Sequence, residues 1–216
     1  QRVVISTNTI NLQDQLLHKD IPLLREALGV DFRAGVLKGR GNYLCPRRLA
    51  SMRRRLPTTV DELRVFAKVL IWLLESSSGD RSEINLRGAA EIGAWMRLSA
   101  EDEGCTMERC HTQMHGSCPF YKARRTAESA HILIVNHALL LADVAIGSRV
   151  LPEYHYLILD EAHHLEEATT NGLSFRLDQV TLRRQLAELG GRRSGILGDL
   201  LSSTRNAFPP SYLEQL

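Results

Sequence analysis

The sequence has no long hydrophobic run and no secretory leader. Its most apolar stretch, Val65 to Leu74, is ten residues long and contains Lys68, whereas a helix needs about 20 apolar residues to cross a bilayer. The chain begins without an initiator Met, and no basic segment precedes its first apolar run, Val3 to Ile5. We therefore expect no membrane segment, and we interpret the chain as an internal piece of a longer protein.

Acidic residues are absent between Phe32 and Val60, although the formal net charge of the whole chain is only +2. Eight basic residues lie in this stretch: Arg33, Lys38, Arg40, Arg47, Arg48, Arg53, Arg54 and Arg55. Such a basic block is either a solvated face or a contact for a polyanion. Composition alone leaves both alternatives open.

Three stretches of the chain repeat one pattern, a short apolar strand followed by a turn and a helix. The strands are expected at Val3–Ser6, His131–Val135 and Tyr156–Leu159. The first helix is a leucine stripe from Leu12 to Leu28, interrupted near Pro22, and the third is expected to begin at Glu161. Since 44% of the residues are hydrophobic, the chain can form a core. Three strand–helix units predict an α/β fold with a parallel sheet.

A stretch of different character, residues 39–125, separates the first unit from the second. It has helical patterns at Val60–Glu75 and Arg87–Met96. Beyond Leu173 the pattern changes again, to polar helices expected at 177–189 and 196–205. We interpret 39–125 as an insertion into the sheet domain and 173–216 as the start of another domain.

The chain has four cysteines, and all of them lie in the insertion. Cys45, Cys105, Cys110 and Cys118 are separated by 59, 4 and 7 residues. Disulfides, a zinc site and an iron–sulfur cluster are the alternatives, and disulfides are disfavoured because nothing indicates secretion. The Cys-x2-Cys pairs of zinc ribbons are absent, whereas the Cys-x4-Cys gap suits a larger cluster. The spacing therefore favours iron–sulfur without excluding zinc or ligation by His111 and His115.

Two adjacent carboxylates and a histidine follow the third predicted strand. In a nucleotide-driven motor, Asp160 would hold a hydrated Mg²⁺ beside the triphosphate, and Glu161 would orient and deprotonate the attacking water. His163 would sense the γ-phosphate. The apolar run Leu157–Leu159 is typical of a strand buried in a parallel sheet, whose carboxyl edge binds ligands. Although an Asp-Glu pair can also simply begin a helix, this context favours a nucleotide site.

Together these motifs resemble the DinG/XPD family of superfamily 2 DNA helicases. The similarity covers most of residues 3–168 and rests on the cysteine insertion and on three segments: Ser-Thr-Asn-Thr-x2-Leu-Gln-x-Gln at 6–15, Val-Asn-His-Ala-Leu-Leu at 135–140, and Asp-Glu-Ala-His at 160–163. The resemblance implies a partial RecA-like parallel sheet, of the P-loop NTPase fold, in 1–38 and 126–172. It further implies an iron–sulfur domain at 39–125 and the start of a helical arch domain at 173–216.

The resemblance also implies roles for single residues. The four cysteines would ligate a 4Fe-4S cluster, Asp160 and Glu161 would form the Walker B pair that binds Mg-ATP, and His163 would couple hydrolysis to DNA movement. Seven residues would contact or line the path of single-stranded DNA: Thr7, Thr9, Gln13, Arg40, Tyr43, Arg47 and Arg48.

The implied activity is that of an ATP-dependent DNA helicase of 5′ to 3′ polarity. It would translocate on single-stranded DNA and unwind forked or damaged duplexes in DNA repair, as a monomer, in the bacterial cytoplasm at the nucleoid or in a eukaryotic nucleus. Its cofactors would be the 4Fe-4S cluster, Mg²⁺ and ATP, with no membrane partner.

One motif of such motors is missing from the sequence. No Gly-x4-Gly-Lys-Ser/Thr occurs, so we expect the phosphate loop and the second motor domain outside this chain, which alone should not hydrolyse ATP. Two alternatives remain, a non-catalytic zinc-bearing nucleic-acid-binding module and an RNA motor.

Overall fold

The computed structural model describes residues 1–101, 105–114, 116–147, 150–174, 179–191 and 195–204. The chain forms two compact units, Gln1–Leu173 and Ser174–Leu216. The described part of the second unit contains helices α10 (Gln179–Leu189) and α11 (Gly195–Thr204). No helix in the described ranges is both long enough and apolar enough to cross a membrane.

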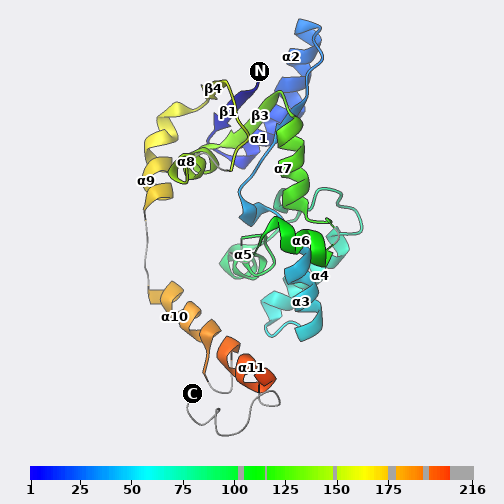
Figure 1. The fold of residues 1–216 in the computed structure, drawn as a ribbon, viewed down its shortest axis with the longest axis vertical. Coiled ribbons are helices and arrows are strands. Elements are labelled where there is room, and N and C mark those ends of the chain that lie inside the picture. Colours follow the sequence, from blue (N-terminus) through cyan, green and yellow to red (C-terminus); the bar gives the residue numbers. More distant parts are fainter. Residues whose placement is uncertain (102–104, 115, 148–149, 175–178, 192–194, 205–216) are drawn as a thin grey trace. The chain divides into compact units, whose positions relative to one another are not determined.

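The first unit contains one parallel sheet of four strands in the order β2-β3-β1-β4. Figure 1 labels three of them, β1, β3 and β4, which lie side by side. The strands are β1 (Val3–Thr7), β2 (Ala34–Val36), β3 (Ile132–Asn136) and β4 (Tyr156–Leu159). Val3 of β1 pairs with Ile132 of β3 on one side and with Tyr156 of β4 on the other. The predicted α/β fold with a parallel sheet is confirmed, and the arrangement is that of a partial RecA-like domain.

Two helical segments follow the first and second predicted strands. α1 (Ile10–Gln15), a π-helical segment (Leu16–Asp20) and α2 (Ile21–Leu28) run without a break after β1. The irregularity expected near Pro22 therefore precedes the proline. The proline closely follows the π-helical segment, and a change in the helical hydrogen-bond pattern of this kind accommodates a residue that has no N–H to donate. Helix α8 (His137–Ala145) follows β3, and both α1 and α8 contact that strand.

The prediction for the third strand is only half right. β4 has the expected bounds, but it lies at the edge of the sheet and is not buried. Its four side chains are 40% to 54% exposed. The physical reason is that β4 pairs with β1 on one side only among the described strands.

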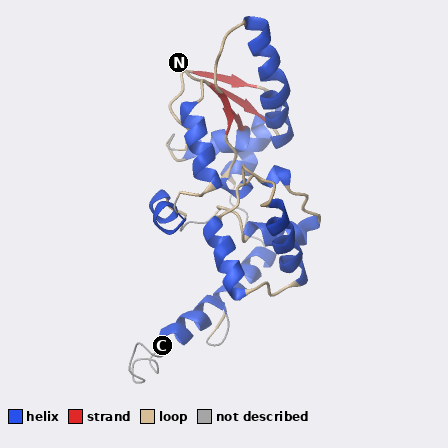
Figure 2. Ribbon diagram, turned by 90° about the vertical axis from the view of Figure 1, so that its right-hand side faces the viewer, coloured by secondary structure: helices blue, strands red, loops and turns tan. Residues whose placement is uncertain are grey.

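The insertion is mainly helical. Four helices lie wholly within its described residues: α3 (Pro46–Arg55), α4 (Val60–Trp72), α5 (Gly88–Met96) and α6 (Met107–Met114). A further helix, α7 (Pro119–Ser129), begins within it and extends past its expected end at residue 125. The two helical patterns expected from the sequence are confirmed as α4 and α5. Trp72 and Trp95 from these helices meet edge to face at 6.0 Å in a core that is separate from the sheet. Figure 2 shows the strands grouped toward one end of the unit, and α7 contacts β2 there.

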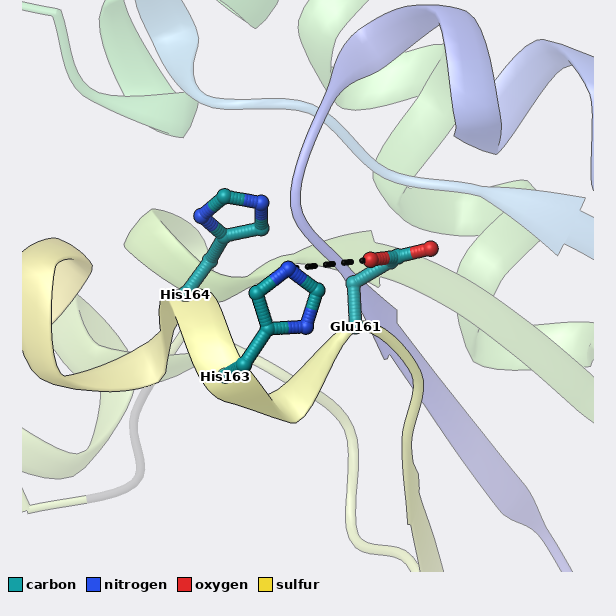
Figure 3. A group of neighbouring side chains, drawn as sticks. All are labelled: Glu161, His163 and His164. Carbon is teal, nitrogen blue, oxygen red and sulfur yellow. Dashed lines mark ion pairs between the residues drawn. The ribbon is translucent and has the colours of Figure 1, made fainter.

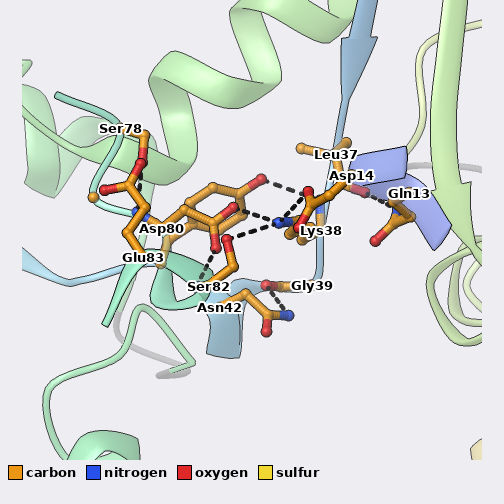
Figure 4. Close-up of polar contacts among 12 residues, drawn as sticks. Gln13, Asp14, Leu37, Lys38, Gly39, Asn42, Ser78, Asp80, Ser82 and Glu83 are labelled. Carbon is orange, nitrogen blue, oxygen red and sulfur yellow. Dashed lines mark hydrogen bonds and ion pairs between the residues drawn. The ribbon is translucent and has the colours of Figure 1, made fainter. Parts of the chain in front are cut away.

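Lys38 fixes the insertion to the sheet domain. It lies just after β2 and is 2% exposed. Its ammonium group contacts the carboxylates of Asp14 on α1 at 3.1 Å and Asp80 in the insertion at 2.7 Å, and donates to the Ser82 hydroxyl at 3.2 Å (Figure 4). A buried charge is tolerated only when it is paired in this way. Lys38, a member of the basic block, therefore forms internal ion pairs and is not a surface contact for a polyanion.

Candidate functional site

β1 holds the first carboxylate of the acidic box in place. The backbone N–H of Asp160 donates to the carbonyl of Ser6 at 2.8 Å, and the Thr7 hydroxyl donates to Asp160 Oδ2 at 3.0 Å. Both contacts lie at the carboxyl edge of the sheet, because β1 and β4 are parallel neighbours. A carboxylate fixed at this edge is suited to bind a divalent cation beside a ligand.

Glu161 has an unusual backbone conformation. Its φ of 55° is in the left-handed region, which among the described non-glycine residues is shared only with Leu56. The helix expected to begin at Glu161 does not do so: a 3-10 turn covers Ala162–His164 and α9 covers Leu165–Leu173. The Glu161 side chain makes no capping hydrogen bond. A strained position of this kind, which costs about 1–3 kcal/mol, is often found at functional sites.

His163 and His164 lie directly beside Glu161. The Nε2 atom of His163 is 3.4 Å from Glu161 Oε2, and the two imidazole rings are 4.0 Å apart. Figure 3 shows the His163 ring turned toward the Glu161 carboxylate. The three residues predicted for nucleotide chemistry, Asp160, Glu161 and His163, are therefore brought together in one turn after β4.

The four cysteines are free thiols, and each is at most 3% exposed. They lie in one core cluster that also contains Tyr43 and Phe120. Cys45 and Cys118 are the N-cap residues of α3 and α7, and each precedes a proline that opens its helix. Two helices therefore begin at this cluster, with the positive ends of their dipoles beside it.

The thiols interact with one another. Burial, the largest cause, together with the neighbouring Cys118 and Cys105 raises the pKa of Cys110 to about 12. Burial also raises the pKa of Cys105. Four buried thiols do not ionise together unless a cation compensates their charge, and metal binding supplies that compensation. The donor set therefore fits a metal centre.

The residues of segment 6–15 that were predicted to contact DNA, Thr7, Thr9 and Gln13, have internal partners. Thr7 and Gln13 are fully buried, and Gln13 Nε2 donates to the Leu37 carbonyl at 3.5 Å. The Thr9 hydroxyl accepts from the Leu12 N–H at 3.3 Å and so caps α1. These side chains thus connect β1 to β4, cap α1, and join α1 to the segment after β2. A DNA contact by these side chains stays a prediction.

The residues predicted to line the DNA path near Cys45 are buried or half-buried, and most of them contact other residues of the insertion. Arg40 stacks over Phe120 at 5.1 Å and donates to the Cys105 carbonyl at 3.1 Å, while Tyr43 is 3% exposed. Arg48 donates to the carbonyls of residues 96, 99 and 101. Arg47 is half-buried at the start of α3.

Sequence reasoning gave no role to Arg53 and Arg54 beyond membership of the basic block. Both are exposed in the last turn of α3. The signal that could have found them is the run of three arginines at positions 53–55, since a run at the end of a helix cannot turn entirely toward the core.

Comparison with known proteins finds a matching family model and several similar DinG and YoaA proteins. A family model described as DEAD_2 matches residues 98–182. The chain is 31% identical over 209 residues to the 3′-5′ exonuclease DinG of Bacillus subtilis. The aligned residues make up 96% of this chain and 22% of that protein. It is 34% identical over 187 residues to the ATP-dependent DNA helicase DinG of Salmonella typhimurium, covering 79% of this chain and 26% of the relative.

The ATP-dependent DNA helicase YoaA of Escherichia coli is also similar, at 31% identity over 196 residues, or 88% of this chain and 29% of the relative. The chain thus spans between 22% and 29% of the length of these curated relatives.

Proposed function

This chain is related to the DinG-like helicases over most of its own length, and from that premise we propose that it is a segment of an ATP-dependent DNA helicase motor. The observation that carries the proposal is the turn after β4, where Asp160 is bound to β1 through Thr7 and Glu161 lies beside His163 at 3.4 Å. This is the place and the residue set at which a RecA-like motor hydrolyses ATP.

Each residue of the turn has a separate task in this proposal. The Asp160 carboxylate, oriented by the Thr7 hydroxyl, holds the hydrated Mg²⁺ of Mg-ATP. Glu161 orients the attacking water and accepts its proton, and its position outside the helix leaves the carboxylate free to do so. His163 lies 3.4 Å from the Glu161 carboxylate. Its imidazole therefore responds directly when hydrolysis changes the charge or position of that carboxylate.

We also propose that Cys45, Cys105, Cys110 and Cys118 hold a 4Fe-4S cluster. The four thiols belong to one buried cluster, so a single centre can take all of them as ligands. The Cys-x2-Cys pairs of zinc ribbons are absent, and the gap of four residues between Cys105 and Cys110 supports a larger cluster, whose role is to tie the insertion together.

Single-stranded DNA, in forked or damaged duplexes, is the proposed substrate, with 5′ to 3′ movement by a monomer. The exposed Arg53 and Arg54 are the better candidates for a phosphate contact in the basic block, because Lys38, Arg40 and Arg48 are used internally. Contacts of this kind bind any sequence, as a translocating motor requires.

The exposed edge strand β4 supports the idea that the motor domain is completed by further chain. We propose that the phosphate loop and a second motor domain are supplied by other parts of the intact protein, and that this segment alone does not turn over ATP. The apolar side chains of β4, 40% to 54% exposed, are suited to burial in a larger sheet.

The test uses the intact parent protein. Glu161→Gln is expected to bind ATP as the wild type does and to lower ATP turnover and duplex unwinding by about 100-fold or more, since a general base contributes at least that factor. Glu167→Gln, on the exposed side of α9, is the matched control and should keep wild-type rates. Hydrolysis by Glu161→Gln at the wild-type rate contradicts the proposal.

The same assay separates the alternatives. Substrates with a 5′ or a 3′ single-stranded tail, in DNA and in RNA, report polarity and distinguish a DNA motor from an RNA motor. No nucleotide-dependent activity with any tail would favour a non-catalytic zinc-bearing module that binds nucleic acid.

A further inference from the structure

Besides Asp160, Glu161 and His163, the turn after β4 contains a further titratable residue, His164, which has no role in the proposed hydrolysis. His164 lies next to His163, and its imidazole belongs with His163 and Glu161 to a group whose ligand atoms are all within 4.8 Å of one another. Glu161 and His163 are exposed and His164 is half-buried, so all three can be reached from solvent. Figure 3 shows the two rings and the carboxylate gathered on one side of the turn.

Two imidazoles and one carboxylate form a donor set with a distinct metal preference. Zn²⁺ and similar borderline cations bind histidine nitrogen and carboxylate oxygen, often with three protein ligands and one open position. Mg²⁺ takes oxygen ligands in octahedral geometry and does not match this set. The group therefore differs in chemistry from the Asp160 carboxylate beside it.

The observed spacing is close to what a tetrahedral ion requires. With metal–ligand bonds of about 2.0–2.1 Å, adjacent ligand atoms lie about 3.3 Å apart. The His163 nitrogen and the Glu161 oxygen are already 3.4 Å apart, and only the half-buried His164 ring has to approach. The left-handed backbone of Glu161 keeps its carboxylate beside the rings and out of the helix that follows.

We propose that Glu161, His163 and His164 form a binding site for a borderline divalent transition-metal cation, with Zn²⁺ as the representative ion. The site is separate from the Mg²⁺ site at Asp160. If the proposed function is correct, a bound Zn²⁺ occupies the Glu161 carboxylate and blocks its action as a base, so the cation inhibits the motor. Binding itself does not depend on that function.

The experiment is a Zn²⁺ titration of the chain, purified without oxygen and labelled with ¹⁵N in its histidine rings. One equivalent of Zn²⁺ is expected to shift the ring signals of His163 and His164, assigned with His163→Asn and His164→Asn, while the metal content at the cysteines stays unchanged. His164→Asn should weaken binding at least tenfold. His18→Asn, at an exposed position outside the turn, is the matched control and should bind as the wild type does.

Two results overturn the proposal: Zn²⁺ that shifts only other histidines, or equal affinity in wild type and His164→Asn. Ring signals are read in the wild type first, so a poorly folded variant does not decide the outcome. In the intact parent, Zn²⁺ should inhibit ATP hydrolysis in the wild type more than in His164→Asn. A parent without ATPase activity would reject the proposed function and leave the binding result standing.

Discussion

At the scale of single residues, Thr7 joins the two strands that carry the acidic box. Its hydroxyl donates to Asp160 across the pair β1–β4. Thr7→Val keeps the shape and removes the donor, and we expect a loss of about 1–2 kcal/mol in the free energy of unfolding because a charged acceptor loses its partner. Urea denaturation measures the loss. Thr7→Ser, which keeps the hydroxyl, should recover most of it, and equal stability of Thr7→Val and wild type would contradict this role.

Glu62 makes the stability of the insertion dependent on pH. This buried carboxylate accepts from the Thr58 N–H at 2.8 Å and hydroxyl at 2.9 Å, and pairs with Arg55 and Arg97. Burial alone would raise its pKa, but the bonds from Thr58 and the two arginine charges outweigh burial and hold the pKa below its ordinary value of 4.5. The folded state therefore binds this proton less readily than the unfolded state does.

Stability from Glu62 is consequently present above its unfolded pKa and is lost as the pH falls through the lower folded value. We expect the melting temperature of the wild type to fall below about pH 4.5, and that of Glu62→Gln to be lower at neutral pH and to change less in acid. Thermal unfolding between neutral and acidic pH measures this difference. Parallel curves for the two proteins would show that Glu62 is not responsible.

At the scale of elements, the sequence predicted those with strong periodicity. The strands at 3–7, 132–136 and 156–159 and the helices α4 and α5 are apolar runs or stripes that local reasoning recognises. β2 was missed because Ala-Gly-Val at 34–36 has almost no apolar pattern and becomes a strand only by pairing with β3. α3 was missed because its arginines look like a charged loop, whereas Arg48 is fixed by three carbonyls.

The candidate site was predictable in its residue types and less so in its geometry. The acidic box and the cysteines stand out in the sequence. The left-handed Glu161, the contact from Thr7 to Asp160 and the burial of Tyr43 depend on tertiary neighbours. Residues that a motif presents as surface contacts can therefore be internal ones.

Lys38, just after β2, connects α1 to the insertion through its ion pairs with Asp14 and Asp80. Lys38→Met leaves the Asp14 and Asp80 carboxylates without their cation. We expect a loss of about 2–3 kcal/mol, less than for a fully buried pair because Asp14 is partly exposed. Limited proteolysis should cut the insertion faster. Lys19→Met, on the exposed π-helical segment, is the control. Unchanged proteolysis of Lys38→Met would show that the insertion is held by its apolar core alone.

At the scale of the whole molecule, the cysteine cluster and the sheet share a core. Val4 and Leu133 of the sheet belong to the same buried cluster as the four thiols, while the tryptophan core of the insertion is separate. A metal centre bound by the four thiols would therefore stabilise the contact between the sheet and the insertion.

The most direct test of the account is the content of iron, acid-labile sulfide and zinc in the chain purified without oxygen. The account predicts about four iron and four sulfide per chain, one iron for each thiolate. The Cys110→Ser variant should lose most of both. One zinc per chain with no sulfide, in protein never exposed to added zinc, would contradict the iron–sulfur helicase and favour a zinc-bearing nucleic-acid-binding module.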